Sequence, residues 1–169
     1  FLCAKFSISK TDFTMQINHY FDTPDLLLKK HESALRIREK NESYILTLKQ
    51  PNQIGLLETH QKVTQAEANK AFQDGNLPHG TIAEQLQKSF QIDILNFNYL
   101  GSLKTYRAET NYLDGTLVFD HSIYFEAEDF EIEYEVVDEI TGKEIFENIF
   151  VSYQIPIKKT DNKIRRFFL

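Results

Sequence analysis

The feature that most constrains this chain is an alternation of polar and apolar side chains that recurs over most of its length. Across residues 34–38, two aliphatic side chains share one face of an extended chain, and Arg36 and Arg38 share the other. A period of two residues predicts β-strands. We expect them over residues 16–22, 34–39, 44–50, 56–62, 103–112, 116–125 and 130–138, with a terminal one near 164–168.

Turn and helix signals separate the predicted strands. The dipeptide Asp114-Gly115 predicts a tight hairpin, and a second turn is expected over residues 40–43. A threonine followed three residues later by a glutamate is a capping box, which starts a helix. Such pairs occur at Thr64/Glu67, Thr81/Glu84 and Thr141/Glu144, and a shorter helix is expected after Asp22-Thr23-Pro24.

These patterns predict an α+β protein in which helices lie between strand pairs of a mainly antiparallel sheet. The strands are numerous and similar in length, which is compatible with closure into a barrel but does not prove it. A length of 169 residues suits one domain, spanning residues 1–169, with a single core.

The composition limits which binding partners and which cellular compartment we expect for this protein. The formal net charge of −6 gives no basic footprint, so nucleic acid is not expected. The longest apolar runs are a handful of residues, so we expect neither a signal peptide nor a membrane span. The one cysteine, Cys3, cannot form an internal disulfide, which fits a reducing compartment and predicts a cytoplasmic protein.

The polar faces of the strands tend to carry charges of one sign. Cations occupy three of them, at Arg36, Arg38, Lys49 and Arg107, and carboxylates occupy two others, at Asp120, Glu131, Glu133 and Glu135. An ordinary solvated sheet face also alternates in this way. However, three carboxylates on one face repel each other unless a cation lies between them. A hydrated interior lined by both signs of charge removes that difficulty.

Such an interior suits a triphosphate bound with a metal ion. Guanidinium groups bind closely spaced phosphate oxygens bidentately. Mg²⁺ takes hard oxygen ligands at about 2.0–2.1 Å, and carboxylates at i and i+2 of one strand, such as Glu131 and Glu133, can reach one ion together. Cleavage of a phosphoanhydride then depends on positioning, charge neutralisation and an activated water.

The segments that carry these residues resemble the CYTH superfamily, also called triphosphate tunnel metalloenzymes, and especially its YjbK-like stand-alone bacterial members. In the family's order they are Tyr20–Pro24, Ala34–Arg38, Leu46–Pro51, Gly55–Thr59, Tyr106-Arg107, Leu113–Gly115, Phe119-Asp120, Glu131–Glu133 and Asn162–Arg166. Each segment is weak alone, but the ordered series covers nearly the whole chain. The resemblance implies an antiparallel, eight-stranded closed β-barrel with helices packed outside and a triphosphate bound inside.

The resemblance also implies roles for single residues. Phosphate-binding residues would be Arg36, Arg38, Lys49 and Arg107, joined by Lys163 and Arg166 of the C-terminal segment. The carboxylates that hold Mg²⁺ or Mn²⁺ would be Asp120, Glu131 and Glu133. Lys163 and Glu58 would be the catalytic residues, with Glu58 positioning either the metal or a water molecule. We expect the cations and carboxylates to share one cavity.

One motif of the family, Glu-x-Glu-x-Lys on its first strand, is absent from this sequence. Residues 1–6 instead read as the tail of an amphipathic helix, with apolar side chains at positions 1, 2 and 6. They resemble the helix that follows that strand in the family. We therefore expect the natural chain to carry the motif on an upstream strand.

The leading functional hypothesis is metal-dependent hydrolysis of inorganic triphosphate or a small organic triphosphate. An adenylate cyclase of the CYTH type and a non-catalytic phosphate-binding module remain alternatives, and the protein could be a monomer or a homodimer. The five histidines lack the spacing of zinc ligands. His60 shares a strand face with Glu58, which leaves two alternatives: a side chain that faces the interior, or an ordinary polar position.

Overall fold

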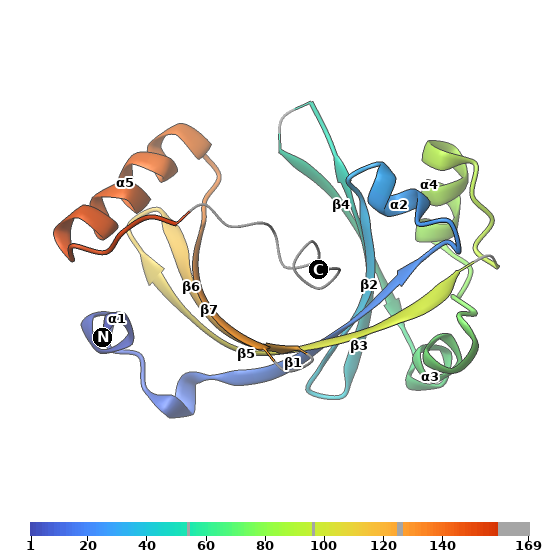
Figure 1. The fold of residues 1–169 in the computed structure, drawn as a ribbon, viewed down its shortest axis with the longest axis horizontal. Helices are drawn as coiled ribbons and strands as arrows, with labels where there is room; N and C mark the ends of the chain where they lie inside the picture. Colours follow the sequence, from blue (N-terminus) through green and yellow to red (C-terminus); the bar gives the residue numbers. More distant parts are fainter. Residues whose placement is uncertain (54, 96, 125–126, 159–169) are drawn as a thin grey trace. The chain divides into compact units, whose positions relative to one another are not determined.

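The computed structural model describes residues 1–158 apart from residues 54, 96 and 125–126 (Figure 1). Two compact units make up the chain. The central unit spans Gln16–Lys104, and the terminal unit combines Phe1–Met15 with Thr105–Leu169. Each unit has its own hydrophobic core. A single domain over residues 1–169 stays a prediction.

Four strands of the central unit follow one another in sequence and space. They are β1 (Thr14–Asp22), β2 (Ala34–Lys40), β3 (Ser43–Pro51) and β4 (Leu56–Val63). Each pairs antiparallel with the next. Asn41 and Glu42 form the predicted turn between β2 and β3 at positive φ values of 49° and 60°. The period-two alternation therefore located all four strands.

One face of β2 and β3 is apolar and forms the core of the central unit. Leu35 and Ile37 on β2 and Leu46 and Leu48 on β3 are all 0% exposed. Three helices cover this face: α2 (Leu27–Lys30), α3 (Gln65–Asp74) and α4 (Thr81–Phe90) (Figure 1). Burial of each such aliphatic side chain contributes about 1.5–3 kcal/mol. The side chains between these residues are therefore held on the opposite face.

Helix α3 begins as the sequence predicts. The Thr64 hydroxyl accepts a hydrogen bond from the Glu67 amide at 3.2 Å, and the Glu67 carboxylate accepts one from the Thr64 amide at 2.7 Å. The predicted capping box at Thr64 is therefore confirmed.

The other two predicted capping boxes are wrong. Helix α4 has Gly80 as its N-cap, and Oε1 of Gln61 on β4 accepts from the Ile82 amide at 3.1 Å. Helix α5 (Glu139–Ser152) has Asp138 as its N-cap, and Oδ1 of Asp138 accepts from the Ile140 amide at 3.0 Å. Because these acceptors already satisfy the first free amides, the two threonines lie inside their helices.

The terminal unit is built around β5 (Asn98–Tyr112), β6 (Gly115–Tyr124) and β7 (Ala127–Glu135). Strand β5 starts in the central unit and continues into this one. A short helix, α1 (Leu2–Lys5), a 3₁₀ turn, η1 (Lys10–Asp12), and α5 complete the unit. Leu117, Phe119 and Ile149 form its core, with side chains such as Phe6 and Phe146 packed against them. The apolar side of α5 therefore packs on the sheet.

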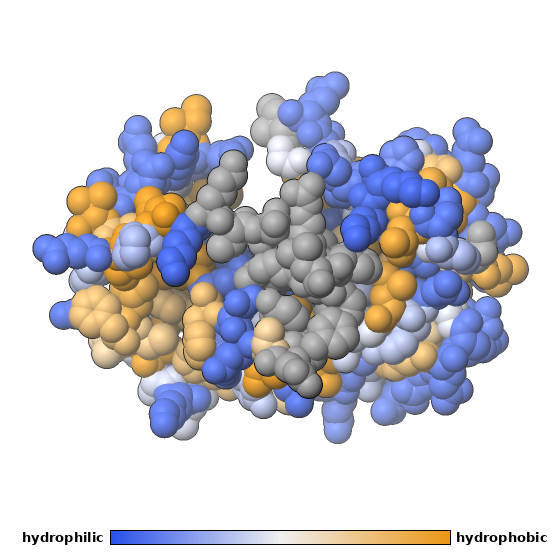
Figure 2. Space-filling view, viewed as in Figure 1, coloured by the Kyte–Doolittle hydropathy of each residue, from blue (hydrophilic) through white to orange (hydrophobic). Residues whose placement is uncertain are grey.

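Hydrophobic side chains also reach the surface over α5 (Figure 2), where Ile140 and Val151 are exposed. Among the described residues, no helix has both the length and the apolar content needed to cross a membrane.

The predicted closed eight-stranded barrel is wrong, although the α+β class is correct. The described residues form one seven-stranded sheet in the order β4-β3-β2-β1-β5-β6-β7 (Figure 1). That order has two ends, and no described strand joins β4 to β7. Alternation predicts strands, but closure depends on strand number, tilt and stagger, which no local pattern contains. The strand predicted near 164–168 lies outside the described residues.

Candidate active site

A polar face of β2, β3 and β4 gathers the predicted site residues of the central unit. Directly opposed residues of an antiparallel pair lie on the same face. Thr47 stands opposite both Arg36 and His60, and Lys49 stands opposite Glu58. The polar face therefore includes Arg36, Arg38, Thr47, Lys49, Glu58 and His60. The buried leucines and isoleucine on the other side fix this orientation.

The two arginines of the polar face have different surroundings. Nε of Arg38 donates to Oδ1 of Asn18 at 3.0 Å, and Asn18 is buried. Nε of Arg36 is buried and has no hydrogen-bond acceptor among the described residues. An unsatisfied buried donor costs about 1–3 kcal/mol. An anionic oxygen bound by Arg36 would remove that cost, which favours a ligand with oxyanions.

Lys49 and Glu58 form a short ion pair, with Nζ and Oε1 2.6 Å apart. Burial opposes ionisation of Glu58, but the hydrogen bond from Lys49 and the nearby cations outweigh it and lower the pKa of Glu58. Burial and the charges of Arg36 and Arg38 lower the pKa of Lys49, despite the opposite effect of Glu58. Glu58 is the one carboxylate that β2, β3 and β4 place on this face. It therefore offsets repulsion among Arg36, Arg38 and Lys49.

The predicted metal-binding carboxylates come together in the terminal unit. Asp120 on β6 stands opposite Glu131 on β7, and Glu133 is two residues further along β7. One ligand oxygen from each of the three lies within 4.8 Å of the others. Phe119 and Ile132, which alternate with them, pack in the core on the other face. Strand alternation thus aims all three carboxylates the same way.

Arg107 on β5 lies among these carboxylates. Its Nε and one terminal nitrogen donate to the two oxygens of Asp120 at 2.7 and 2.6 Å, and the same terminal nitrogen donates to Glu133 at 3.1 Å. Burial alone disfavours the charged guanidinium, but the hydrogen bonds to Asp120 and the charges of Asp120, Glu133 and Glu135 raise the pKa of Arg107. Arg107 therefore stays charged and holds the carboxylates close together.

The donor set of this cluster fits a hard divalent cation. Mg²⁺ and Mn²⁺ prefer carboxylate oxygens, and three converge here. Both oxygens of Asp120 accept from Arg107, so a bound ion would share Asp120 with the guanidinium. The chemistry of the residues therefore suits the metal that the sequence predicts.

Two of the predicted site residues, Lys163 and Arg166, lie outside the described residues. That all the cations and carboxylates share one cavity also stays a prediction. Sequence reasoning missed Asn18, which holds Arg38 from the neighbouring strand. The signal that would have found it is the register of β1 on β2, where Asn18 stands opposite Arg38.

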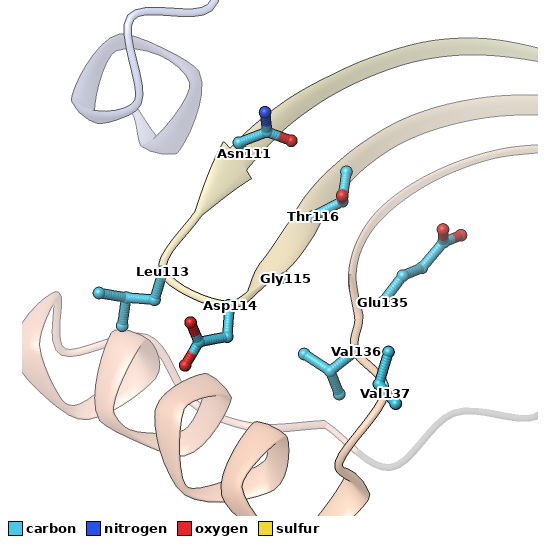
Figure 3. Close-up of a pocket in the computed structure, with 8 residues that line it drawn as sticks. All are labelled: Asn111, Leu113, Asp114, Gly115, Thr116, Glu135, Val136 and Val137. Carbon is cyan, nitrogen blue, oxygen red and sulfur yellow. The ribbon is translucent and has the colours of Figure 1, made fainter.

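A pocket of about 630 Å³ in the terminal unit is a poor candidate for an anion site (Figure 3). It lies beside the β5–β6 turn and the segment that leads into α5. Its lining includes the carboxylates of Asp114 and Glu135 and no basic residue. A triphosphate would be repelled there, so this pocket is not a candidate for binding it.

Comparison with known proteins identifies the class to which this fold and these clusters belong. A family model for the CYTH domain matches residues 2–168. The chain therefore belongs to the CYTH domain family.

Two similar proteins carry names that point to nucleotide or triphosphate chemistry. "Putative triphosphatase YjbK" of Bacillus subtilis (strain 168) is 44% identical over 167 residues, covering 99% of this chain and 86% of that protein. A crystal structure of a "putative adenylate cyclase" from Bacillus halodurans is 42% identical with a TM-score of 0.94, covering 99% of this chain and 89% of that one.

A more distant structure shares the fold alone. It is "Putative adenylyl cyclase HpAC1" from Hippeastrum, for which a dominant triphosphatase activity is described. It is 22% identical with a TM-score of 0.84, covering 99% of this chain and 87% of that one.

Proposed function

We propose that this CYTH-domain protein hydrolyses a triphosphate, inorganic or attached to a small organic group, with the help of a divalent metal ion. The observation that carries the proposal is the presence of two chemistries: a polar face of β2–β4 rich in cations, and a carboxylate cluster on β6 and β7. A triphosphate–metal complex requires both. The 44% identity to "Putative triphosphatase YjbK" supports the same reaction.

The cations of the polar face would bind the phosphate oxygens. Arg36 and Arg38 present planar forks suited to bidentate contact, and Lys49 supplies a third charge on the same face. Burial and repulsion from Arg36 and Arg38 lower the pKa of Lys49, and an anion bound there would reduce that repulsion. We extend the same role to Lys163 and Arg166 from the family resemblance.

Asp120, Glu131 and Glu133 would hold Mg²⁺ or Mn²⁺. When bound, such an ion neutralises phosphate charge that would otherwise resist attack. Arg107 holds two of these carboxylates close together, because its guanidinium contacts Asp120 and Glu133 directly.

Glu58 is proposed to orient the attacking water. Its pKa is lowered, so it is ionised at neutral pH and can accept a hydrogen bond from water. Lys49 holds one of its oxygens, which limits the directions in which the other can point. Orientation of this kind is the main requirement for phosphoanhydride cleavage.

A second candidate function is the cyclisation of ATP to cyclic AMP. The relative from Bacillus halodurans, at 42% identity, is named a "putative adenylate cyclase". Cyclisation needs a site that holds the nucleoside so that the ribose hydroxyl attacks the α-phosphate. We favour hydrolysis because no segment of the sequence reads as a dedicated adenine pocket.

Product analysis separates the candidates. The protein is incubated with inorganic triphosphate and with ATP, each with Mg²⁺ or Mn²⁺. The variants Glu131→Gln and Glu133→Gln, which each remove one proposed metal-binding carboxylate, are assayed in the same way. Orthophosphate from triphosphate, lost in both variants while the folded spectrum persists, is the expected result. Cyclic AMP with pyrophosphate would overturn hydrolysis, and tight binding without turnover would indicate a phosphate-binding module.

We also propose that the protein acts in the cytoplasm as a monomer or homodimer. A single cysteine fits a reducing compartment. Neither proposal affects the chemistry above.

A further inference from the structure

His60 completes a row of polar side chains that runs along β3 and β4. Oγ1 of Thr47 lies 3.0 Å from Nδ1 of His60, and Nε2 of His60 lies 3.7 Å from Oε2 of Glu58. The other oxygen of Glu58, Oε1, accepts from Lys49 at 2.6 Å. The row is therefore Thr47, His60, Glu58 and Lys49, built from the cross-strand pairs 47↔60 and 49↔58.

The two nitrogen neighbours of Glu58 contact it unequally. Lys49 makes a short hydrogen bond to the carboxylate, whereas His60 lies just beyond hydrogen-bond distance. A shift of about half an ångström to one ångström would bring Nε2 of His60 within range. Glu58 thus has one partner and a second one close by.

Thr47 determines how the imidazole ring is presented. Thr47 is 2% exposed, so its hydroxyl is fixed within the sheet. If that hydroxyl donates to Nδ1, the ring proton is carried by Nε2, the nitrogen that faces Glu58. His60 is then a ready donor to the carboxylate.

A bound anion would compete with Glu58 for Lys49. Lys49 shares its face with Arg36 and Arg38, and their charges act on it. Phosphate oxygens gathered by the two arginines would attract the lysine ammonium as well. Each step of Lys49 toward such an anion weakens its hold on Glu58.

We propose that His60, oriented by Thr47, is a positioning residue. It replaces Lys49 as the hydrogen-bond donor to Glu58 when Lys49 moves toward the phosphate oxygens of the substrate. This inference rests on the proposed function, because it assumes that Glu58 acts on the triphosphate. The exchange keeps the carboxylate pointed in one direction through turnover. Its loss would lower kcat while leaving KM nearly unchanged, because His60 itself does not hold the anion.

The first test measures turnover of inorganic triphosphate by the full chain and its variants. His60→Ala should lower kcat about tenfold, since a hydrogen bond to a charged group is lost. His60→Gln should recover most of the rate, because an amide can accept from Thr47 and donate to Glu58. His79→Ala is the matched control, since His79 is an exposed histidine of the same unit.

The second test does not depend on turnover. Ring ¹⁵N signals are recorded for the wild type with and without saturating inorganic triphosphate. The Nε2 signal of His60 should move on binding while that of His79 stays. Lys49→Met without ligand should already show the moved His60 signal, because Glu58 has lost its lysine there.

The two tests separate this inference from the proposed function. A wild type that binds but does not hydrolyse triphosphate would refute the hydrolysis, and a moved His60 signal would still support the exchange. An active wild type whose His60→Ala variant keeps full kcat, with an unmoved His60 signal, would overturn the inference and leave hydrolysis intact.

Discussion

Replacing Arg107 with methionine should destabilise the protein more than any other single loss of charge in the carboxylate cluster. The side chain of Arg107 is 10% exposed, and that of Asp120 is 0% exposed. Arg107→Met keeps an unbranched side chain but removes both hydrogen bonds to Asp120. The three carboxylates then face each other without the guanidinium.

The magnitude follows from burial. Removing one partner of a buried ion pair costs about 3–5 kcal/mol, because the remaining charge stays desolvated. The contacts of Arg107 to Glu133 and Glu135 add little, since those side chains are 38% and 62% exposed. Arg107→Lys keeps the charge but loses the planar fork, so an intermediate loss is expected.

Urea denaturation followed by circular dichroism measures these losses as free energies of unfolding. Lys104→Met, an exposed lysine on the same strand, is the control and should stay within about 0.5 kcal/mol of the wild type. Added Mg²⁺ should stabilise Arg107→Met more than the wild type, because the ion no longer shares Asp120 with the guanidinium.

A loss below about 1 kcal/mol for Arg107→Met would refute the reasoning, since it would place the pair among solvent-screened surface contacts. Equal stabilisation of the variant and the wild type by Mg²⁺ would separately show that Arg107 and the ion do not share Asp120.

Three further measurements test local features. Thr64→Ala should cost about 1 kcal/mol of unfolding free energy, whereas Thr81→Ala should cost less because Thr81 is not an N-cap. Gly75→Ala should cost more than about 1 kcal/mol, because φ is 74° and an added Cβ would meet the Phe97 carbonyl oxygen; an unchanged urea midpoint would contradict this. Burial, partly offset by Glu39, lowers the pKa of His19 below 6.5. Stability should therefore fall as the pH drops below 6.5, since the unfolded chain binds the proton first, and His19→Phe should flatten that slope.

Local patterns predicted the secondary structure well wherever the deciding forces are local. Alternation located β1 to β4 closely, and the capping box at Thr64 was correct. Prediction was weaker for the later strands, because β5 begins at Asn98 rather than residue 103 and β7 ends at Glu135 rather than residue 138. The α4 cap was missed because its acceptor, Gln61, comes from a neighbouring strand.

The candidate site shows the same division between what local patterns predict and what contacts between distant segments decide. Strand alternation placed Arg36 and Arg38 on one face and Glu131 and Glu133 on one face. It gave no sign that Arg107 would pair with Asp120, because the two are thirteen residues apart and meet through the sheet.

By itself the sequence determined which segments are strands, which face of each is polar and which sign of charge that face carries. These properties follow from the order of side chains along an extended chain, which has a fixed period. Tertiary structure alone decided which strands are neighbours, in what register they pair and whether the sheet closes. Those outcomes depend on packing of the apolar faces against helices and on hydrogen bonds between distant segments, so the described residues form an open strand order in place of the barrel that the family resemblance implied.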